Sequence, residues 1–151
     1  MNRSLKKNRI SFTLPTLLLL SWVNLFEQAH AEVLVVMHKS AAVSTLSSAE
    51  IKMIYLGKSK NITENTVAHI IDHLVSSPLR EEFYQKATNK TTAKSVRIWA
   101  RYMFSGNGTP PMIAKDDKEV LDIINQYPDS GIGYIQRQHM NDQVKIVYVL
   151  Q

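Results

Sequence analysis

The chain has 151 residues, a formal net charge of +5 and no cysteine. The lack of cysteine excludes disulfides, zinc–thiolate sites and cysteine nucleophiles, so a hydrophobic core must hold the fold together. Four of the 18 Lys and Arg residues lie in positions 1–9, and residues 32–151 keep 14 of them against 12 acids, a net charge of +2. This ordinary balance makes nucleic acid a poor candidate as a partner.

Residues 1–31 have the pattern of a secretory signal peptide. Residues 1–9 are basic, residues 10–26 are mostly apolar, and Ala29-His30-Ala31 supplies small residues at the two positions that a signal peptidase reads. We expect cleavage after Ala31, export to a bacterial periplasm, and one domain over residues 32–151. An uncleaved membrane anchor is the alternative, which Pro15 and the Ala-x-Ala ending disfavour.

Strands and helices are expected to alternate along residues 32–151. Apolar runs predict strands at 33–37, near 66–71, at 132–135 and at 144–149. Capping residues and apolar periodicity predict helices that begin near 47, 77, 91 and 116, and Gly57 is expected to end the first of them. Residues 58–65 and 105–111 are expected to be loops. Strands separated by helices predict an α/β fold with a mostly parallel sheet flanked by helices.

The helix expected from residue 91 carries two different side-chain patterns. Apolar residues recur at the spacing of a buried face: Val96, Trp99, Ala100 and Met103. Basic residues form a separate stripe: Lys94, Arg97 and Arg101. The simplest interpretation of that stripe is a solvated helix face.

The segment from Ser76 to Tyr84 predicts an anion site. It follows an apolar strand, and two serines stand before Pro78, which suits the first position of a helix. A strand, a short turn and a capped helix direct free backbone N–H groups and the positive end of the helix dipole at one point. An ordinary capped helix without a ligand is the alternative that these residues leave open.

Four segments resemble, in the same order, periplasmic phosphate-binding proteins of ABC transporters: Ser47–Lys58, Ser77–Tyr84, Trp99–Gly106 and Gly131–Tyr134. The resemblance is closest to small proteins with a single lobe of the type 2 periplasmic binding protein fold. It implies an exported, non-enzymatic phosphate-binding-like or anion-binding protein, linked to a transport or sensing system, with no cofactor or metal. The ligand-binding residues that we expect are His73, Ser76, Ser77 and Arg80.

The chain also departs from this family. Full-length phosphate binders have two lobes, and residues 32–151 supply the length of one. His73 stands where the family has an arginine, and Pro78, which lacks an N–H donor, replaces a glycine. The alternative is therefore an envelope interaction module that kept the fold and lost its ligand, as a homodimer or bound to an envelope protein. A metal site at His69 and His73, four residues apart, is a weaker alternative.

Overall fold

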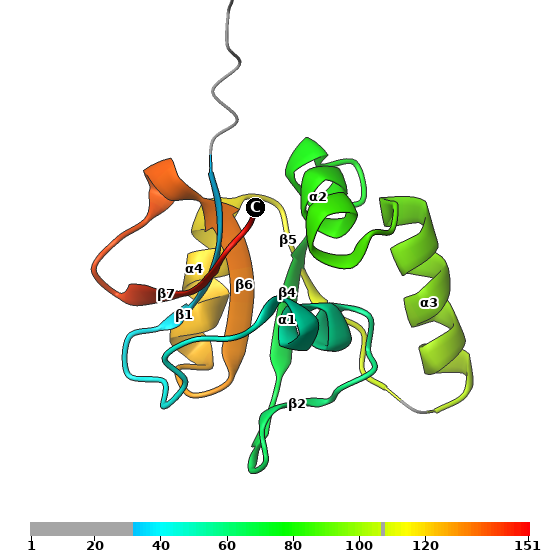
Figure 1. Cartoon of the computed structure of the whole chain (residues 1–151), viewed down its shortest axis with the longest axis horizontal. Coiled ribbons are helices and arrows are strands. Elements are labelled where there is room, and N and C mark those ends of the chain that lie inside the picture. The colour runs from blue at the N-terminus through cyan, green and yellow to red at the C-terminus, as the bar shows by residue number, and fades with distance from the viewer. Residues whose placement is uncertain (1–31, 107) are drawn as a thin grey trace, which may run out of the picture.

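A five-stranded sheet forms the centre of the computed structural model, which describes residues 32–106 and 108–151 (Figure 1). Its strand order is β5-β4-β6-β1-β7, and the predicted signal peptide lies outside the described residues. The strands are β1 (Val33–His38), β4 (His69–His73), β5 (Met112–Ala114), β6 (Gly131–Gln136) and β7 (Val144–Val149).

Four of these five strands run in one direction. β4 is parallel to β5 and to β6, whereas β1 is antiparallel to both of its neighbours, β6 and β7. Only β1 is therefore reversed within the described sheet, and the predicted α/β fold with a mostly parallel sheet is confirmed.

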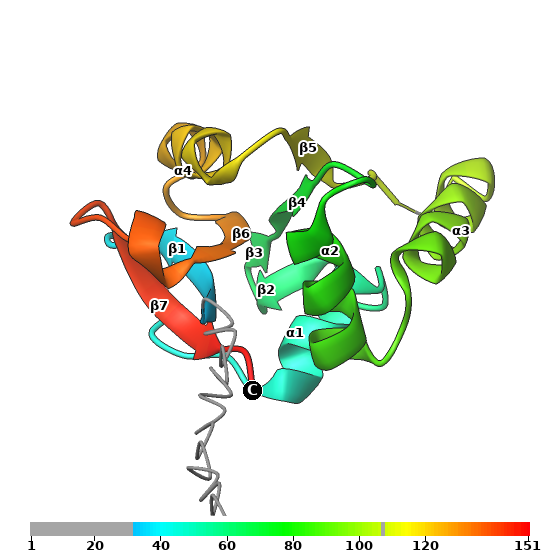
Figure 2. The ribbon, with the colours of Figure 1, turned by 90° about the horizontal axis from the view of Figure 1, so that it is seen from above.

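Helices cover both faces of the sheet (Figure 2). They are α1 (Ser48–Tyr55), α2 (Pro78–Phe83), α3 (Thr92–Phe104) and α4 (Asp117–Gln126); α2 continues as a π-helical turn, η1 (Tyr84–Thr88), and a short 3₁₀ turn, η2 (Arg137–His139), follows β6. α4 lies on one face, and α1 and α2 lie on the other. None of the helices in the described ranges is long and apolar enough to cross a membrane.

The predicted helix starts agree with the caps that the structure shows. Ser47 and Glu50 form a capping box at α1, and the Thr91 hydroxyl accepts from the Lys94 N–H at α3. Gly57 ends the first helical segment with a φ of +68°, a left-handed conformation that glycine adopts without strain.

One loop prediction was wrong in part, and one short strand was not predicted. Part of the expected loop at 58–65 belongs to a hairpin, β2 (Asn61–Thr63) and β3 (Thr66–Val67), and β5 was not expected at all. These strands have two or three residues each, too few for an alternating pattern to be visible in the sequence.

The sheet separates two hydrophobic clusters. Val33, Val35 and Met37 of β1 pack with α1, α2 and η1 on one face. Leu34 and Val36 pack with α4 on the other face. Because successive side chains of a strand point to opposite faces, the continuous apolar run of β1 is buried on both, as expected.

α3 lies at the edge of the molecule (Figures 1 and 2). Trp99 is buried, as predicted, and its Nε1 donates to the backbone oxygen of Tyr55 at 3.1 Å. The predicted burial of Val96 and Met103 was wrong, because 39% and 52% of their surfaces are exposed. The buried residues of α3 are Thr92, Ser95 and Trp99, a narrower face than the apolar spacing suggested.

Candidate functional site

The carboxyl ends of three parallel strands meet at one edge of the sheet. β4 ends at His73, β5 at Ala114 and β6 at Gln136. α2 and α4 begin shortly after β4 and β5 respectively, so their amino ends lie at the same edge. In open α/β sheets this edge is where ligands usually bind. We call it the carboxyl edge.

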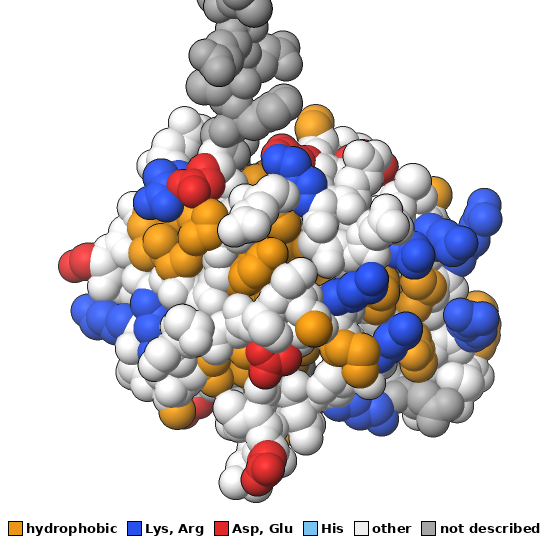
Figure 3. All heavy atoms as spheres, viewed as in Figure 1, with side chains coloured by type: hydrophobic (Ala, Val, Ile, Leu, Met, Phe, Trp, Pro, Cys, Tyr) orange, Lys and Arg blue, Asp and Glu red, His pale blue; other side chains and the backbone are white. Residues whose placement is uncertain are grey.

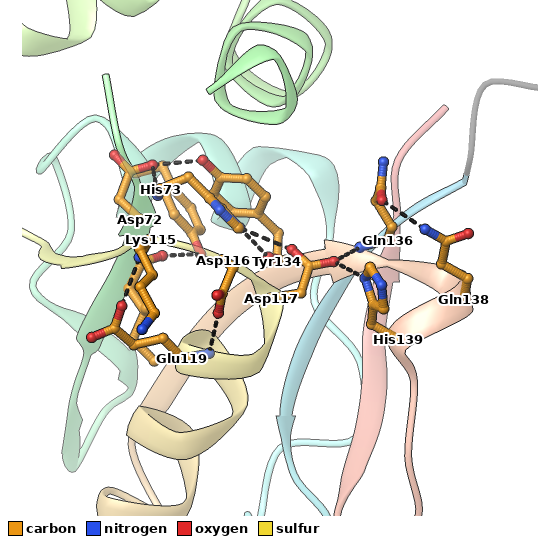
Figure 4. A network of polar contacts seen from close by, with 12 residues as sticks. Asp72, His73, Lys115, Asp116, Asp117, Glu119, Tyr134, Gln136, Gln138 and His139 are labelled. Atoms are coloured by element: carbon orange, nitrogen blue, oxygen red, sulfur yellow. Dashed lines mark hydrogen bonds and ion pairs between the residues drawn. The ribbon is translucent and has the colours of Figure 1, made fainter. Parts of the chain in front are cut away.

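Asp72 forms the centre of a buried polar network just below the carboxyl edge (Figure 4). Its Oδ1 accepts from the Tyr134 hydroxyl at 2.6 Å and from the His73 N–H at 2.8 Å. Its Oδ2 accepts from the Tyr84 hydroxyl at 2.8 Å and lies 3.0 Å from Nη2 of Arg80. A buried carboxylate needs such donors, and here they come from β4, β6, α2 and η1.

Arg80 points into this network and fastens α2 to β4. Nη1 donates to the His73 backbone oxygen at 2.8 Å, and Nη2 makes the ion pair with Asp72. The side chain is buried, and among the described residues its Nε finds no hydrogen-bond partner. Both terminal nitrogens of the Arg80 guanidinium therefore bind groups of β4 and stabilise the carboxyl edge.

His73 is also buried and connects Asp72 to a second carboxylate. Its Nε2 lies 3.0 Å from the Tyr134 backbone oxygen and 3.4 Å from Oδ1 of Asp117, in the first turn of α4. Oδ2 of Asp117 accepts from the Gln136 N–H at 2.8 Å and lies 2.6 Å from Nδ1 of His139 (Figure 4). Asp117 thus places negative charge at the amino end of α4, where a helix dipole favours it.

Ser76 and Ser77 occupy the surface of the carboxyl edge in front of α2. Ser76 is exposed and Ser77 is half-buried. Ser77 has the extended backbone of an N-cap, but within residues 32–106 and 108–151 its hydroxyl makes no capping hydrogen bond. Pro78 follows at the first helical position. The Ser77 hydroxyl therefore accepts no hydrogen bond from the N–H groups of the first turn. The hydroxyls of Ser47 at α1 and Thr91 at α3 do accept such a bond.

Burial raises the pKa values of the groups around Asp72. It raises the pKa of Asp72 itself, an effect that the Arg80 guanidinium and the hydrogen bonds from Tyr134 and Tyr84 oppose. It also raises the pKa values of Tyr84 and Tyr134, and the negative charge of Asp72 adds to that rise. The two phenols therefore remain hydrogen-bond donors to Asp72 over the physiological pH range.

The four predicted binding residues lie at the same edge but at two depths. Ser76 and Ser77 reach the surface, whereas His73 and Arg80 lie below it in the network of Asp72. Asp117, His139 and Tyr134 were not predicted to belong to this region, and Tyr84 ended the predicted segment without an assigned role. The charge of Asp72, directly after the apolar residues Ile70 and Ile71, was a usable signal, but the side chains that bind it are 8 to 62 positions away in the chain.

The loop at 105–111 leads to the opposite edge of the sheet. Gly108 and Pro110 line a hollow of about 500 Å³ with Trp99, Tyr102 and His69. His69 begins β4 and stacks on Tyr127, with ring centroids 4.2 Å apart, while His73 ends the same strand. The two histidines therefore lie at opposite ends of β4, and no cluster of metal-binding side chains occurs in the described part of the chain.

Comparisons with known proteins identify the fold. No family model and no curated protein matches this chain. Among solved structures it is similar to a protein from Clostridium perfringens described as a phosphate ABC transporter substrate-binding protein, with bound phosphate (TM-score 0.62, 20% identity). It is also similar to an ABC-type phosphate transport receptor from Vibrio cholerae (TM-score 0.60, 14% identity).

Each match covers 77% of this chain but less than half of the solved protein, 44% in the first case and 45% in the second. At these identities the similarity shows the fold. The chain has the fold of a single lobe of the phosphate-transporter binding proteins, as the sequence resemblance implied.

Proposed function

We propose that this chain is an exported, non-enzymatic protein of the periplasm that binds a small anion of the phosphate class weakly and is linked to a transport or sensing system. One observation carries the proposal. The amino end of α2 lies at the carboxyl edge with an uncommitted serine hydroxyl, in a fold that holds phosphate in the Clostridium perfringens protein.

The donors available to an anion are the Ser76 and Ser77 hydroxyls and the N–H groups of the first turn of α2. The positive end of the helix adds favourable potential. Arg80 and His73 act from below: Arg80 fixes the position of α2 against β4, and His73 links Asp72 to Asp117.

Three features predict that binding is weak. Pro78 removes one N–H donor from the first turn. Asp72 offsets much of the Arg80 charge, and Asp117 contributes negative charge at the same edge. Ser76 is exposed, so that solvent weakens charge-assisted hydrogen bonds at this surface.

The test is calorimetry of the protein with phosphate and with sulfate, on wild type and on Ser77→Asp. A carboxylate at this N-cap satisfies the first-turn N–H groups and repels anions, so the variant should keep or gain stability while losing binding. Replacing Arg80 is a poorer test, because it leaves Asp72 buried without its charged partner.

Ser48→Asp is the matched control, because it makes the same charge change in the first turn of α1. It should bind both anions as the wild type does. The proposal is wrong if the wild type shows no heat with either anion, or if Ser77→Asp and Ser48→Asp bind equally well.

An interaction module is the second candidate, and one observation favours it. Leu74 and Val75, directly before Ser76, expose 44% and 59% of their surfaces at the carboxyl edge. Exposed apolar side chains at a rim suit a protein contact. If no anion binds, sedimentation of wild type and Val75→Asp at micromolar concentration should reveal self-association that the variant loses.

A further inference from the structure

The outward side of α3 is both apolar and basic. Three of the eight large apolar side chains that the described residues expose lie on this one helix: Val96, Met103 and Phe104, exposed by 39%, 52% and 93%. The other five are distributed over the rest of the chain. Single exposed apolar residues are ordinary, but a group of this kind on one element marks a contact surface.

The three basic residues run alongside this apolar group. At 100° per residue, Val96, Ala100 and Met103 form one stripe, and Lys94, Arg97 and Arg101 form another, with Phe104 between them. All three basic side chains are exposed, and none takes part in the ion pairs found in the described part of the chain.

No acidic residue lies on α3 to neutralise these cations. Figure 3 shows the result on the surface, where Lys and Arg side chains lie among hydrophobic ones over the edge of the molecule that α3 forms. Thr92, Ser95 and Trp99 hold the side of the helix that adjoins the apolar stripe and lies opposite the basic stripe against the domain. The orientation of the exposed stripes is therefore fixed by the fold.

We propose that the outward side of α3 docks on the surface of an anionic phospholipid bilayer. Charge complementarity favours an anionic bilayer, because anionic headgroups attract an unpaired cationic stripe. The adjacent apolar stripe reaches the boundary with the acyl chains. Phe104 and Met103, at the end of the helix, enter this boundary, and the stems of Arg97 and Arg101 follow the apolar surface while their charged groups stay at the headgroups.

This docking is separate from the proposed anion site. The anion site uses the amino end of α2 at the carboxyl edge, whereas the lipid contact uses the side of α3. The first involves a soluble anion and the second a surface, so each can fail without the other.

The test is cosedimentation with vesicles of phosphatidylglycerol and phosphatidylethanolamine, compared with vesicles of phosphatidylcholine alone. Wild type should bind the anionic vesicles, and added salt should weaken binding because it screens exposed charges. Arg97→Gln with Arg101→Gln should reduce the partition coefficient about 25-fold, since each basic residue near an anionic surface contributes a factor of about five. Met103→Ser with Phe104→Ser should reduce it to a similar degree.

Lys115→Gln with Lys118→Gln is the matched control, because it removes the same charge from exposed positions at the start of α4. This variant should bind as wild type does, and all the proteins carry the same amino terminus, so residues 1–31 contribute equally to each. The proposal is overturned if wild type ignores anionic vesicles. It is equally overturned if the α3 variants bind anionic vesicles as well as the control does. Self-association that Met103→Ser with Phe104→Ser abolishes would also overturn it, because a second copy of the chain would then cover this side of α3.

Discussion

At the scale of the residue, the buried charge of Asp72 determines how the carboxyl edge is built. Two tyrosine hydroxyls, a backbone N–H and a guanidinium surround this carboxylate. Breaking a buried ion pair by removing one partner is costly because it leaves the other charge uncompensated. Arg80 is therefore a structural requirement of the site, whatever further part it takes in binding.

The buried tyrosines predict a loss of stability in alkali. Burial is the main reason that the pKa values of Tyr55, Tyr84 and Tyr134 lie above the ordinary tyrosine value of about 10. Above that pH the unfolded chain releases phenolic protons that the folded chain retains. The free energy of unfolding should therefore be insensitive to these groups below about pH 10 and should fall as the pH rises further, by up to about 1.4 kcal/mol per pH unit for each tyrosine.

Urea unfolding of wild type and Tyr84→Phe at a series of pH values from about 8 to 11 checks this prediction. The variant should lose about 1.5–3 kcal/mol at neutral pH with its hydrogen bond to Asp72, and its stability should fall less steeply in alkali. Equal alkaline slopes for the two proteins would show that Tyr84 ionises in the folded state.

At the scale of the element, the close approach of α4 to β6 sets the position of the helix above the sheet. A Cβ on Gly133 of β6 would lie 2.5 Å from Cγ1 of Val120 on α4. The absence of a side chain at this position lets the helix pack directly on the strand. α4 then presents Asp117 to Gln136 and His73 at the carboxyl edge.

Gly133→Ala should therefore destabilise the protein by about 1–3 kcal/mol through overpacking. Val120→Ala removes the colliding methyl group, so the cost of Gly133→Ala should fall by at least half in that background. Thermal or urea unfolding of the two single variants and the double variant measures this coupling.

Gly108→Ala is the control for this contact, because its Cβ would lie 3.7 Å from Cβ of Tyr102, an ordinary van der Waals distance. It should change stability little. A Gly133→Ala cost that Val120→Ala does not relieve would place the strain elsewhere than between α4 and β6.

At the scale of the whole molecule, the chain covers less than half of each solved phosphate-binding protein that it matches. The carboxyl edge exposes the apolar side chains of Leu74 and Val75. Exposed apolar side chains at this edge suit a contact with another protein.

The expected signal peptide gives a prediction at the same scale. Cleavage after Ala31 should leave Glu32 as the first residue of the protein recovered from outside the cytoplasm. Mass spectrometry of that fraction measures the amino terminus directly. An intact chain that begins at Met1 and stays in the membrane would contradict the prediction and favour the anchor.

Local signals along the chain were enough to predict the fold class and most of the long elements. Continuous apolar runs identified β1, β6 and β7, and capping residues identified where α1, α2, α3 and α4 begin. These signals are local, because a cap, a left-handed glycine or an apolar run acts within a few residues. Four short motifs of the sequence also pointed to the fold that the solved structures share.

Tertiary structure alone decided which side chains meet at the carboxyl edge and which remain exposed. Arg80 turned inward because Asp72, once buried by the sheet, required a cation. Val96 and Met103 stayed exposed because no further element covers that side of α3 in the described structure. Burial depends on neighbours that are distant in the chain, so the spacing of residues within one helix predicts an apolar face but not what packs against it.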